Sequence, residues 1–283
     1  MTVSYAAPIR TALRAWRAAA LGVVCALALV ACGDKDDDNK TYVEQPVEKL
    51  YNNALDALGA GEYKTAAKGF EEVDRQHPYS VWATKAQVMA AFSYYQANKY
   101  DEAILALDRF IQLHPGHRDI AYAYYLKALC YYEQIADVGR DQRITEQALN
   151  ALAEVTKRFP DTAYARDARL KVDLAIDHLG GKEMDVGRFY QTQRQYIGAI
   201  NRYRQVLEKY QTTTHTPEAL HRLVECYLAL GVQQEAKMAA AVLGHNFPGS
   251  DWYADSYYLL EGVDLRPERS DGSWLNRMWK SVF

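Results

Sequence analysis

The sequence contains none of the common short motifs of catalytic or metal sites. After residue 31 it has no glycine-rich phosphate loop, no Cys-x-x-Cys, no His-Glu-x-x-His and no Gly-x-Ser-x-Gly. Its 7 histidines are scattered. His114 and His117 lie near one turn, but Asp119 is the one carboxylate close to them, and a metal site needs a fuller ligand set. We therefore expect no enzyme, no metal ion and no cofactor other than a covalent lipid.

Positive charge is not in excess. The chain has 33 Lys and Arg residues against 36 Asp and Glu residues, and removal of the first 31 residues takes away three arginines, which lowers the net charge from −3 to about −6. No basic stripe interleaved with aromatic residues is present. Nucleic-acid binding is not expected, because it depends on such a stripe.

The apolar run near the start is short. It extends over residues 18–31, only 14 residues, too few to cross a hydrocarbon core of about 30 Å at 1.5 Å per residue. Arg10, Arg14 and Arg17 precede it without any acidic residue, which predicts a cleaved export signal over residues 1–31.

The end of this signal is similar to the lipobox of bacterial lipoproteins. Residues 29–33 read Leu-Val-Ala-Cys-Gly, and the resemblance implies that Cys32 becomes the first residue of the mature chain and carries an N-acyl diglyceride, with palmitate as a typical acyl group. A chance cysteine behind an ordinary signal is the alternative. Gly33, in place of an aspartate, implies retention at the outer membrane. Residues 32–44 are rich in Asp without apolar periodicity, so we expect a flexible tether, and a functional role for the acidic run is the alternative.

Cysteine is otherwise scarce. Of the 4 cysteines, Cys25 leaves with the signal and Cys32 would be acylated. Cys130 and Cys226 are far apart in the repeats described next. We expect both to be buried core residues, because a lone thiol is tolerated in an oxidising compartment when it is buried.

What the sequence does contain is a repeated block. An alanine is followed twelve positions later by a proline, and the successive alanines are 37, 45, 51 and 37 residues apart. The alanines of the five copies are Ala66, Ala103, Ala148, Ala199 and Ala236. Apolar residues at +4 and +7 predict one buried helix face that ends at the proline, and this repeat length predicts stacked supersecondary units.

A second helix is predicted before each block. Small or apolar residues are followed three positions later by an aromatic one, as in Ala91 with Tyr94 and Ala128 with Tyr131. Residues 45 to 250 thus resemble tetratricopeptide repeats. The expected fold is all-α, an α-solenoid of five tetratricopeptide-like helix pairs with a C-terminal capping helix over 251–265. The longer third and fourth repeats predict loop insertions near 137–143 and 180–192, and Gln211, where a proline is expected, leaves the fourth turn in doubt.

The 22 tyrosines suggest a binding surface. In tetratricopeptide arrays the first helix of each pair lines the concave face, and this register predicts a trough for an extended peptide with apolar or aromatic side chains. Lys85 would meet a terminal carboxylate. The alternative is that several tyrosines fill gaps between repeats. The expected trough residues are Tyr51, Leu55, Lys85, Phe92, Tyr95, Tyr122, Tyr125, Leu129 and Tyr132.

A narrower resemblance covers most of the chain. The lipobox, the five repeats, residues 160–168 and residues 187–203 are similar to the BamD (ComL) family of outer-membrane assembly lipoproteins. This resemblance implies a scaffold on the periplasmic face of the outer membrane that ties the barrel subunit to accessory lipoproteins and receives unfolded outer-membrane proteins. It also implies that Arg202 contacts a POTRA domain of that subunit. An exposed arginine without a partner is the alternative at this position.

These interpretations divide the chain into an N-terminal groove region over 45–178, a partner-binding region over 179–265 and a tail over 266–283. The tail has apolar residues on one helical face, from Trp274 to Phe283, so it would lie on a partner, on a membrane interface or on the last repeat. Other lipoprotein scaffolds are the rival function, either for cell-wall enzymes or as a pilus pilotin.

Overall fold

The computed structural model describes residues 44–262, which form eleven α-helices and no strand. The predicted signal, the tether up to residue 43 and the tail lie outside the described residues. The helices are α2 (Val47–Gly59), α3 (Tyr63–Gln76), α4 (Val81–Gln96), α5 (Tyr100–Leu113), α6 (Ile120–Tyr132), α7 (Arg143–Arg158), α8 (Ala163–Thr192), α9 (Tyr196–Lys209), α10 (Thr216–Ala229), α11 (Gln233–Asn246) and α12 (Asp251–Glu261).

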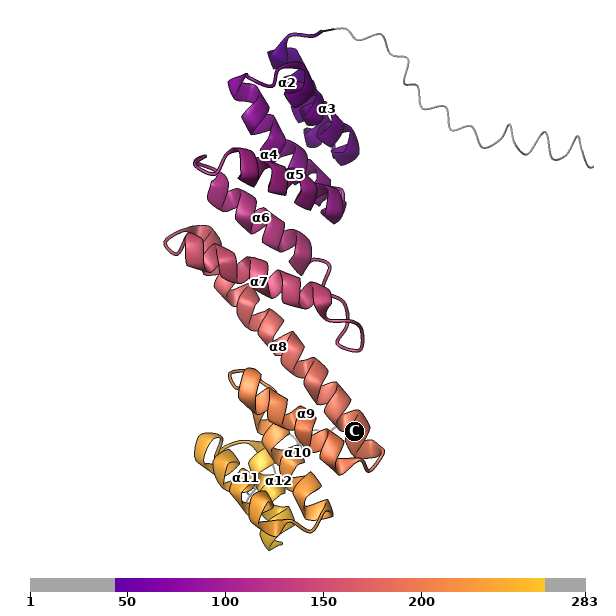
Figure 1. Ribbon diagram of the computed structural model, residues 1–283, viewed down its shortest axis with the longest axis vertical. Coiled ribbons are helices and arrows are strands. Elements are labelled where there is room, and N and C mark those ends of the chain that lie inside the picture. The colour runs from indigo at the N-terminus through magenta and orange to yellow at the C-terminus, as the bar shows by residue number, and fades with distance from the viewer. Residues whose placement is uncertain (1–43, 263–283) are drawn as a thin grey trace, which may run out of the picture. The chain divides into compact units, whose positions relative to one another are not determined.

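Each of these helices packs against the next one along the chain (Figure 1). The predicted helix pairs are α2 with α3, α4 with α5, α6 with α7, α8 with α9 and α10 with α11, so the five-pair architecture is confirmed. Helix α12 packs on α10 and α11 and is the capping helix. It ends at Glu261 and not at residue 265, because Gly262 takes the left-handed conformation with φ 73° and closes the helix.

The turns between pairs share one backbone hydrogen bond. The N–H of Ser80 donates to the His77 carbonyl at 3.0 Å, and equivalent bonds close the later turns. The turn of the fourth repeat lacks proline, yet the Thr213 N–H donates to the Tyr210 carbonyl at 3.1 Å and α9 ends at Lys209. The proline therefore favours this turn but is not required for it.

One predicted loop is wrong. Residues 133–142 do form a loop between α6 and α7, but residues 180–192 continue α8, which reaches 30 residues. Gly180 and Gly187 are buried in this extension, and a Cβ at Gly187 would clash with the Tyr203 ring of α9. The glycine therefore permits close helix packing and does not mark a turn. The expected domain boundary at 178/179 falls inside this helix.

The apolar core is divided along the array. One cluster joins α2, α3 and α4 around Tyr51 and Phe70, and a second joins α4, α5 and α6 around Leu107 and Phe110. A third joins α6, α7 and α8, and the fourth joins α8 to α11 around Tyr203. The thiols of Cys130 and Cys226 are buried in two of these clusters, as predicted, and burial raises the pKa of each to about 12. Such division is the signature of a stack of repeats.

Candidate peptide-binding trough and partner-binding segment

The first helices of the first four pairs lie next to one another. Helix α4 packs on α2 and α6, and α6 packs on α8, so side chains on their common face form one surface. This surface carries eight of the predicted trough residues as exposed or partly buried side chains: Leu55, Lys85, Phe92, Tyr95, Tyr122, Tyr125, Leu129 and Tyr132. We call this surface the trough.

Tyr51 does not belong to the trough, and its prediction is wrong. Only 1% of its surface is exposed, and its ring lies 5.3 Å from that of Phe70 and 4.8 Å from that of Trp82. Its side chain fills the gap between α2, α3 and α4. Lys85 covers the same ring, with Nζ 5.4 Å from the centroid, so this lysine is exposed beside a buried tyrosine.

The tyrosines of α6 stack on a residue of α8. The Tyr164 ring lies 5.6 Å from Tyr122 and 5.2 Å from Tyr125, and it is parallel enough to Tyr125 to stack. The Tyr125 hydroxyl donates to Asp167 Oδ2 at 2.5 Å, and Lys171 pairs with the same carboxylate at 2.9 Å. Tyr164 was not predicted from the sequence, although the register of α8 as a first helix would have included it.

The hydroxyls of two trough tyrosines, Tyr95 and Tyr122, are uncharged at ordinary pH. Desolvation, followed by the nearby carboxylate of Glu133, raises the pKa of Tyr95 to about 12. Desolvation raises the pKa of Tyr122 to about 12 as well. Both hydroxyls therefore stay protonated, and Tyr95 donates a hydrogen bond to Glu133 at 3.3 Å. The rings are held in place while their faces remain partly exposed.

Two hollows extend the trough along α8. One of about 470 Å³ lies beside Tyr132, Leu174 and His178, and another of about 530 Å³ lies between Leu170, Leu174 and the loop at residues 212–214. Leu170 is 65% exposed and Leu174 is 58% exposed. Neither leucine was predicted from the sequence, because the register of the first helices was not continued beyond α6. The trough thus ends in exposed leucines, which suit an apolar peptide side chain.

Arg202 lies on α9 and makes an ion pair inside the chain. Its Nη1 atom donates to Glu183 Oε2 of α8 at 3.1 Å. The arginine side chain is 37% exposed and the glutamate side chain 17% exposed. One edge of the guanidinium is thus held by the extended part of α8, and an arginine fixed in this way has further N–H groups to offer a partner carboxylate.

Next to Arg202, a polar network joins the C-terminal half of α8 to α10. Arg188 Nη1 donates to both carboxylate oxygens of Glu218 at 3.0 Å, and Gln191 donates to Glu225 at 2.8 Å. Arg222 also donates to Glu225 at 2.8 Å. Burial opposes ionisation of Glu225, but hydrogen bonds from His221, Arg222 and Gln191 outweigh it and lower its pKa to about 2. The C-terminal half of α8 is therefore fixed to the last repeat.

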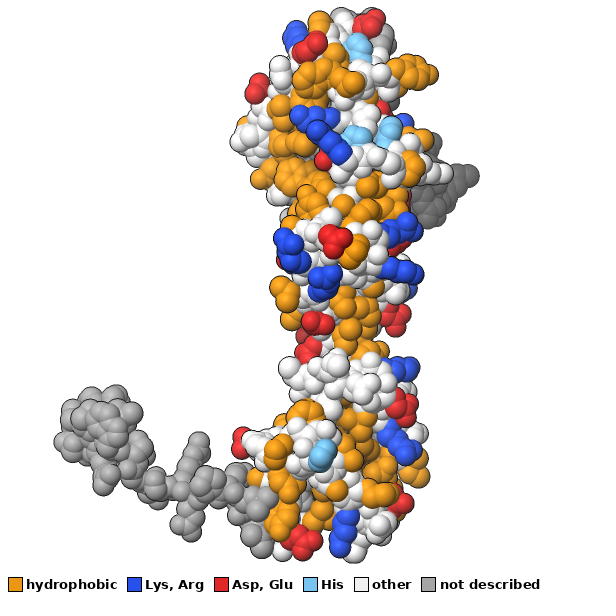
Figure 2. Space-filling view, turned by 90° about the vertical axis from the view of Figure 1, so that its left-hand side faces the viewer, with side chains coloured by type: hydrophobic (Ala, Val, Ile, Leu, Met, Phe, Trp, Pro, Cys, Tyr) orange, Lys and Arg blue, Asp and Glu red, His pale blue; other side chains and the backbone are white. Residues whose placement is uncertain are grey.

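The described residues show no metal centre and no membrane span. His117 Nδ1 accepts a hydrogen bond from the Asp119 backbone, and no three His, Cys, Asp or Glu side chains between residues 44 and 262 gather as a metal site would require. No helix in the same range is long and apolar enough to cross a bilayer. On the face that Figure 2 presents, basic and acidic side chains alternate with apolar ones along the array.

The stacked helix pairs and the aromatic trough place this protein in the class of tetratricopeptide-type scaffolds. Proteins of this class bind other polypeptides along their repeats. The chain belongs to the family described as outer membrane lipoprotein, YfiO, whose model matches residues 43–243. This confirms the resemblance noted in the sequence.

Relatives of known name match over most of their length. The outer membrane protein assembly factor BamD of Caulobacter vibrioides is 51% identical over 87% of this chain and 81% of its own length. The protein of the same name from Rickettsia prowazekii is 45% identical, over 84% and 94% of the two chains. A solved TPR protein of Thermus thermophilus is 20% identical over 75% of this chain and 98% of its own, with a TM-score of 0.35, too low to compare sites.

Proposed function

We propose that this chain is a lipid-anchored scaffold subunit of the machinery that assembles β-barrel proteins in the outer membrane. Its relatives at 51% and 45% identity are named outer membrane protein assembly factors, and this likeness carries the proposal. The acyl chains on Cys32 would hold the repeats at the periplasmic face of the membrane. The scaffold would act by recognition alone, without making or breaking bonds.

The trough would receive unfolded outer-membrane proteins. Its aromatic faces offer a large contact area at a low entropy cost, and the exposed Leu170 and Leu174 extend it for apolar side chains. Lys85 lies at the N-terminal part of the trough, exposed above the Tyr51 ring, where it would meet the C-terminal carboxylate of a substrate segment. The bound segment would be extended.

A synthetic peptide tests the trough. An acetylated decapeptide with alternating apolar and polar residues is prepared with either a free phenylalanine carboxylate or an amide at its end. The free acid should bind the purified, lipidated full chain about 1.4- to fivefold more tightly, because an exposed ion pair contributes about 0.2 to 1 kcal/mol. Lys85→Gln should remove this difference. Calorimetry measures both constants.

Two matched variants make the result specific. Lys237→Gln alters an exposed lysine of α11 and should keep the preference for the free acid. Tyr122→Ala should weaken both peptides, whereas Tyr258→Ala on α12 should weaken neither. Equal binding of the two peptides to every variant would show that Lys85 does not read a carboxylate, and binding unaffected by Tyr122→Ala would remove the trough from the proposal.

The segment around Arg202 would bind the barrel subunit, through one of its POTRA domains, and accessory lipoproteins would join at the same C-terminal half. Charge reversal by Arg202→Glu removes the guanidinium and places a carboxylate beside Glu183, which is 3.1 Å from Arg202 in this chain. Recovery of the barrel subunit with the tagged chain from detergent-solubilised outer membrane should fall several-fold. Loss of a charged interface pair costs about 2 to 5 kcal/mol.

Arg204→Glu is the matched control. Arg204 lies on the same helix and is exposed, so its reversal should leave recovery unchanged. Unchanged recovery with Arg202→Glu, in a variant that melts like the parent chain, contradicts the assignment of this segment. Mass spectrometry of the same sample also separates the rival functions, since a cell-wall enzyme scaffold would recover wall enzymes and a pilotin would recover a secretin.

A further inference from the structure

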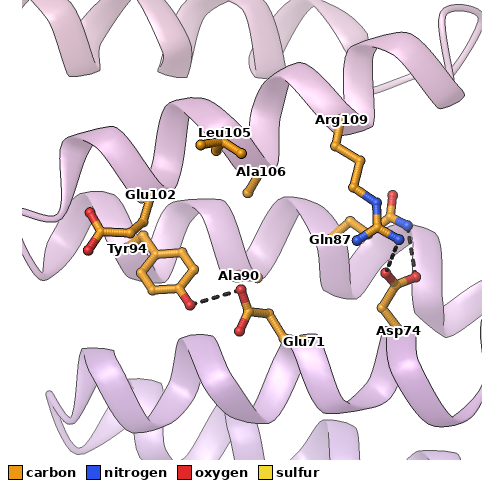
Figure 3. A pocket seen from close by; sticks show the side chains of 9 residues that line it. All are labelled: Glu71, Asp74, Gln87, Ala90, Tyr94, Glu102, Leu105, Ala106 and Arg109. Carbon is orange, nitrogen blue, oxygen red and sulfur yellow. Dashed lines mark hydrogen bonds and ion pairs between the residues drawn. The ribbon is translucent and has the colours of Figure 1, made fainter.

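A third hollow lies between α3 and α5, the second helices of the first two pairs. It measures about 300 Å³ and is bounded by α3 and α5, with α4 as its floor (Figure 3). The hollow uses Gln87, Ala90 and Tyr94 of α4, whereas the trough uses Lys85, Phe92 and Tyr95 of the same helix, so the hollow is a separate surface.

The floor and one wall of the hollow are apolar. Ala90 and Ala106 supply methyl groups, and Leu105 lies at the edge with 73% of its surface exposed. Small side chains on two facing helices leave room that a larger side chain would fill. An aliphatic stem would cover the exposed surface of Leu105 and Ala106, which is favourable, while Ala90, only 2% exposed, forms the floor beneath it.

The opposite wall carries a carboxylate without a cation. Glu71 accepts a hydrogen bond from the Tyr94 hydroxyl at 2.8 Å and makes no ion pair with any described residue. The charge of the neighbouring Asp74 is compensated, because Asp74 accepts a hydrogen bond from Gln87 at 2.8 Å and forms an ion pair with Arg109 at 3.4 Å. Glu71 is thus the acidic group of the hollow whose charge is still uncompensated.

A buried acceptor on α4, the floor of the hollow, also lacks a donor. Gln87 Oε1 is buried without a hydrogen-bond partner among the described residues. Exchanging its oxygen and nitrogen would not help, because the nitrogen already donates to Asp74 and the exchange would set an oxygen against that carboxylate. Burying an unpaired acceptor costs about 1 to 3 kcal/mol, so a donor entering the hollow gains from this site as well.

The next repeat shows what fits such a place. A shift of 37 residues maps Glu71 onto Asp108, Ala90 onto Lys127 and Tyr94 onto Tyr131. In that repeat Lys127 Nζ donates to Asp108 Oδ1 at 2.5 Å. The next repeat thus contains its own lysine beside its carboxylate, whereas the hollow has Ala90 at the position of that lysine.

We propose that the hollow between α3, α4 and α5 binds a lysine side chain of a partner protein, with the ammonium paired to Glu71 and the stem lying over Ala90, Ala106 and Leu105. The partner's lysine takes the place that Lys127 takes in the next repeat. The required ligand is a lysine presented on an exposed segment.

The test uses the lipidated full chain in detergent with labelled alanine and leucine methyl groups. The probe is the peptide acetyl-Gly-Ser-Lys-Ser-Gly-amide, and its control has norleucine in place of lysine. The lysine peptide should shift the Ala90, Ala106 and Leu105 methyl resonances saturably, while the norleucine peptide should not. Glu71→Gln should weaken binding by up to about fivefold, because Glu71 is exposed and an exposed ion pair contributes about 0.2 to 1 kcal/mol. Glu208→Gln, at an exposed carboxylate of α9, should change nothing.

A second variant tests the fit independently. Ala90→Lys copies the lysine of the next repeat, so its ammonium should pair with Glu71 and the variant should no longer respond to the peptide. Adding Glu71→Gln to it should lower the melting temperature further, since the ammonium loses its partner. Equal shifts with both peptides, binding that survives Glu71→Gln, or an Ala90→Lys chain whose melting is insensitive to Glu71 would overturn the proposal.

Discussion

Arg194 adopts a backbone conformation that suits glycine better. Its φ is 59°, in the turn between α8 and α9, whereas the same position of the first and fifth repeats holds Gly61 at 77° and Gly231 at 76°. A side chain in the left-handed region costs about 1 kcal/mol or more. Arg194→Gly should therefore stabilise the chain by about 0.5 to 1 kcal/mol, after the extra freedom of glycine in the unfolded state is subtracted. Urea unfolding measures this.

Arg204→Gly is the opposite case and serves as the control. Arg204 lies in the middle of α9, where glycine should cost about 1 kcal/mol. If Arg194→Gly destabilises the chain as much as Arg204→Gly, the side chain of Arg194 must make a contribution that outweighs the backbone strain.

Single trough residues were harder to predict than their helices. The spacing of small and aromatic residues located the first helix of each pair, but it did not distinguish an inward tyrosine from a surface one. Tyr51 is buried because Trp82 and Phe70, from other helices, enclose its ring. The local sequence around Tyr51 does not predict these contacts. Tyr164 was missed for a different reason, since the register of the first helices was not continued from α6 to α8, where Tyr164 packs on Tyr122 and Tyr125.

At the scale of elements, the sequence indicated helix ends better than helix lengths. Turn chemistry is local, so the prolines marked true helix ends: α3 ends at Gln76 just before Pro78, and α7 ends at Arg158 just before Pro160. The extension of α8 is not local. The extra length of the fourth repeat suggested a loop near 180–192, but a Cβ at Gly180 would stand 3.3 Å from Thr213 and one at Gly181 3.1 Å from His215 Nε2, so tertiary packing selects these glycines.

The extension of α8 holds Arg202, the candidate partner-binding residue, in position. Glu183, Arg188 and Gln191 all lie on the added turns of α8, and each bonds to a side chain of α9 or α10. A loop of the same length would leave Arg202 without a fixed neighbour. The rigid helix instead holds the guanidinium in one orientation, which lowers the entropy that a partner must remove on binding.

At the scale of the whole molecule, the separate apolar clusters make stability regional. Each repeat contacts only its neighbours, so damage to one junction is felt mainly there. The junction of α8 with α10 depends on charge, because Glu225 accepts hydrogen bonds from Gln191 and Arg222 and has a pKa of about 2.

The sign of the pH effect is set by that pKa. A carboxyl whose pKa is lowered by folding stabilises the folded state above its ordinary pKa of about 4.5 and loses this contribution as the pH falls towards 2. The repeats next to Glu225 should therefore loosen first in acid. The contribution at neutral pH is about 3 kcal/mol at most, since each pKa unit corresponds to about 1.4 kcal/mol.

Glu225→Gln tests both the regional character and the charge at neutral pH. Hydrogen exchange should become faster in peptides from the second half of α8 through α12, where the free energy of opening should fall by about 1 to 3 kcal/mol. Exchange in peptides from α2 to α5 should stay unchanged. Glu208→Gln is the control, because that carboxylate is exposed on α9. Equal loss of protection in α2 to α5 would show that the repeats unfold as one unit, and no loss anywhere would show that the charge of Glu225 does not hold α8 to α10.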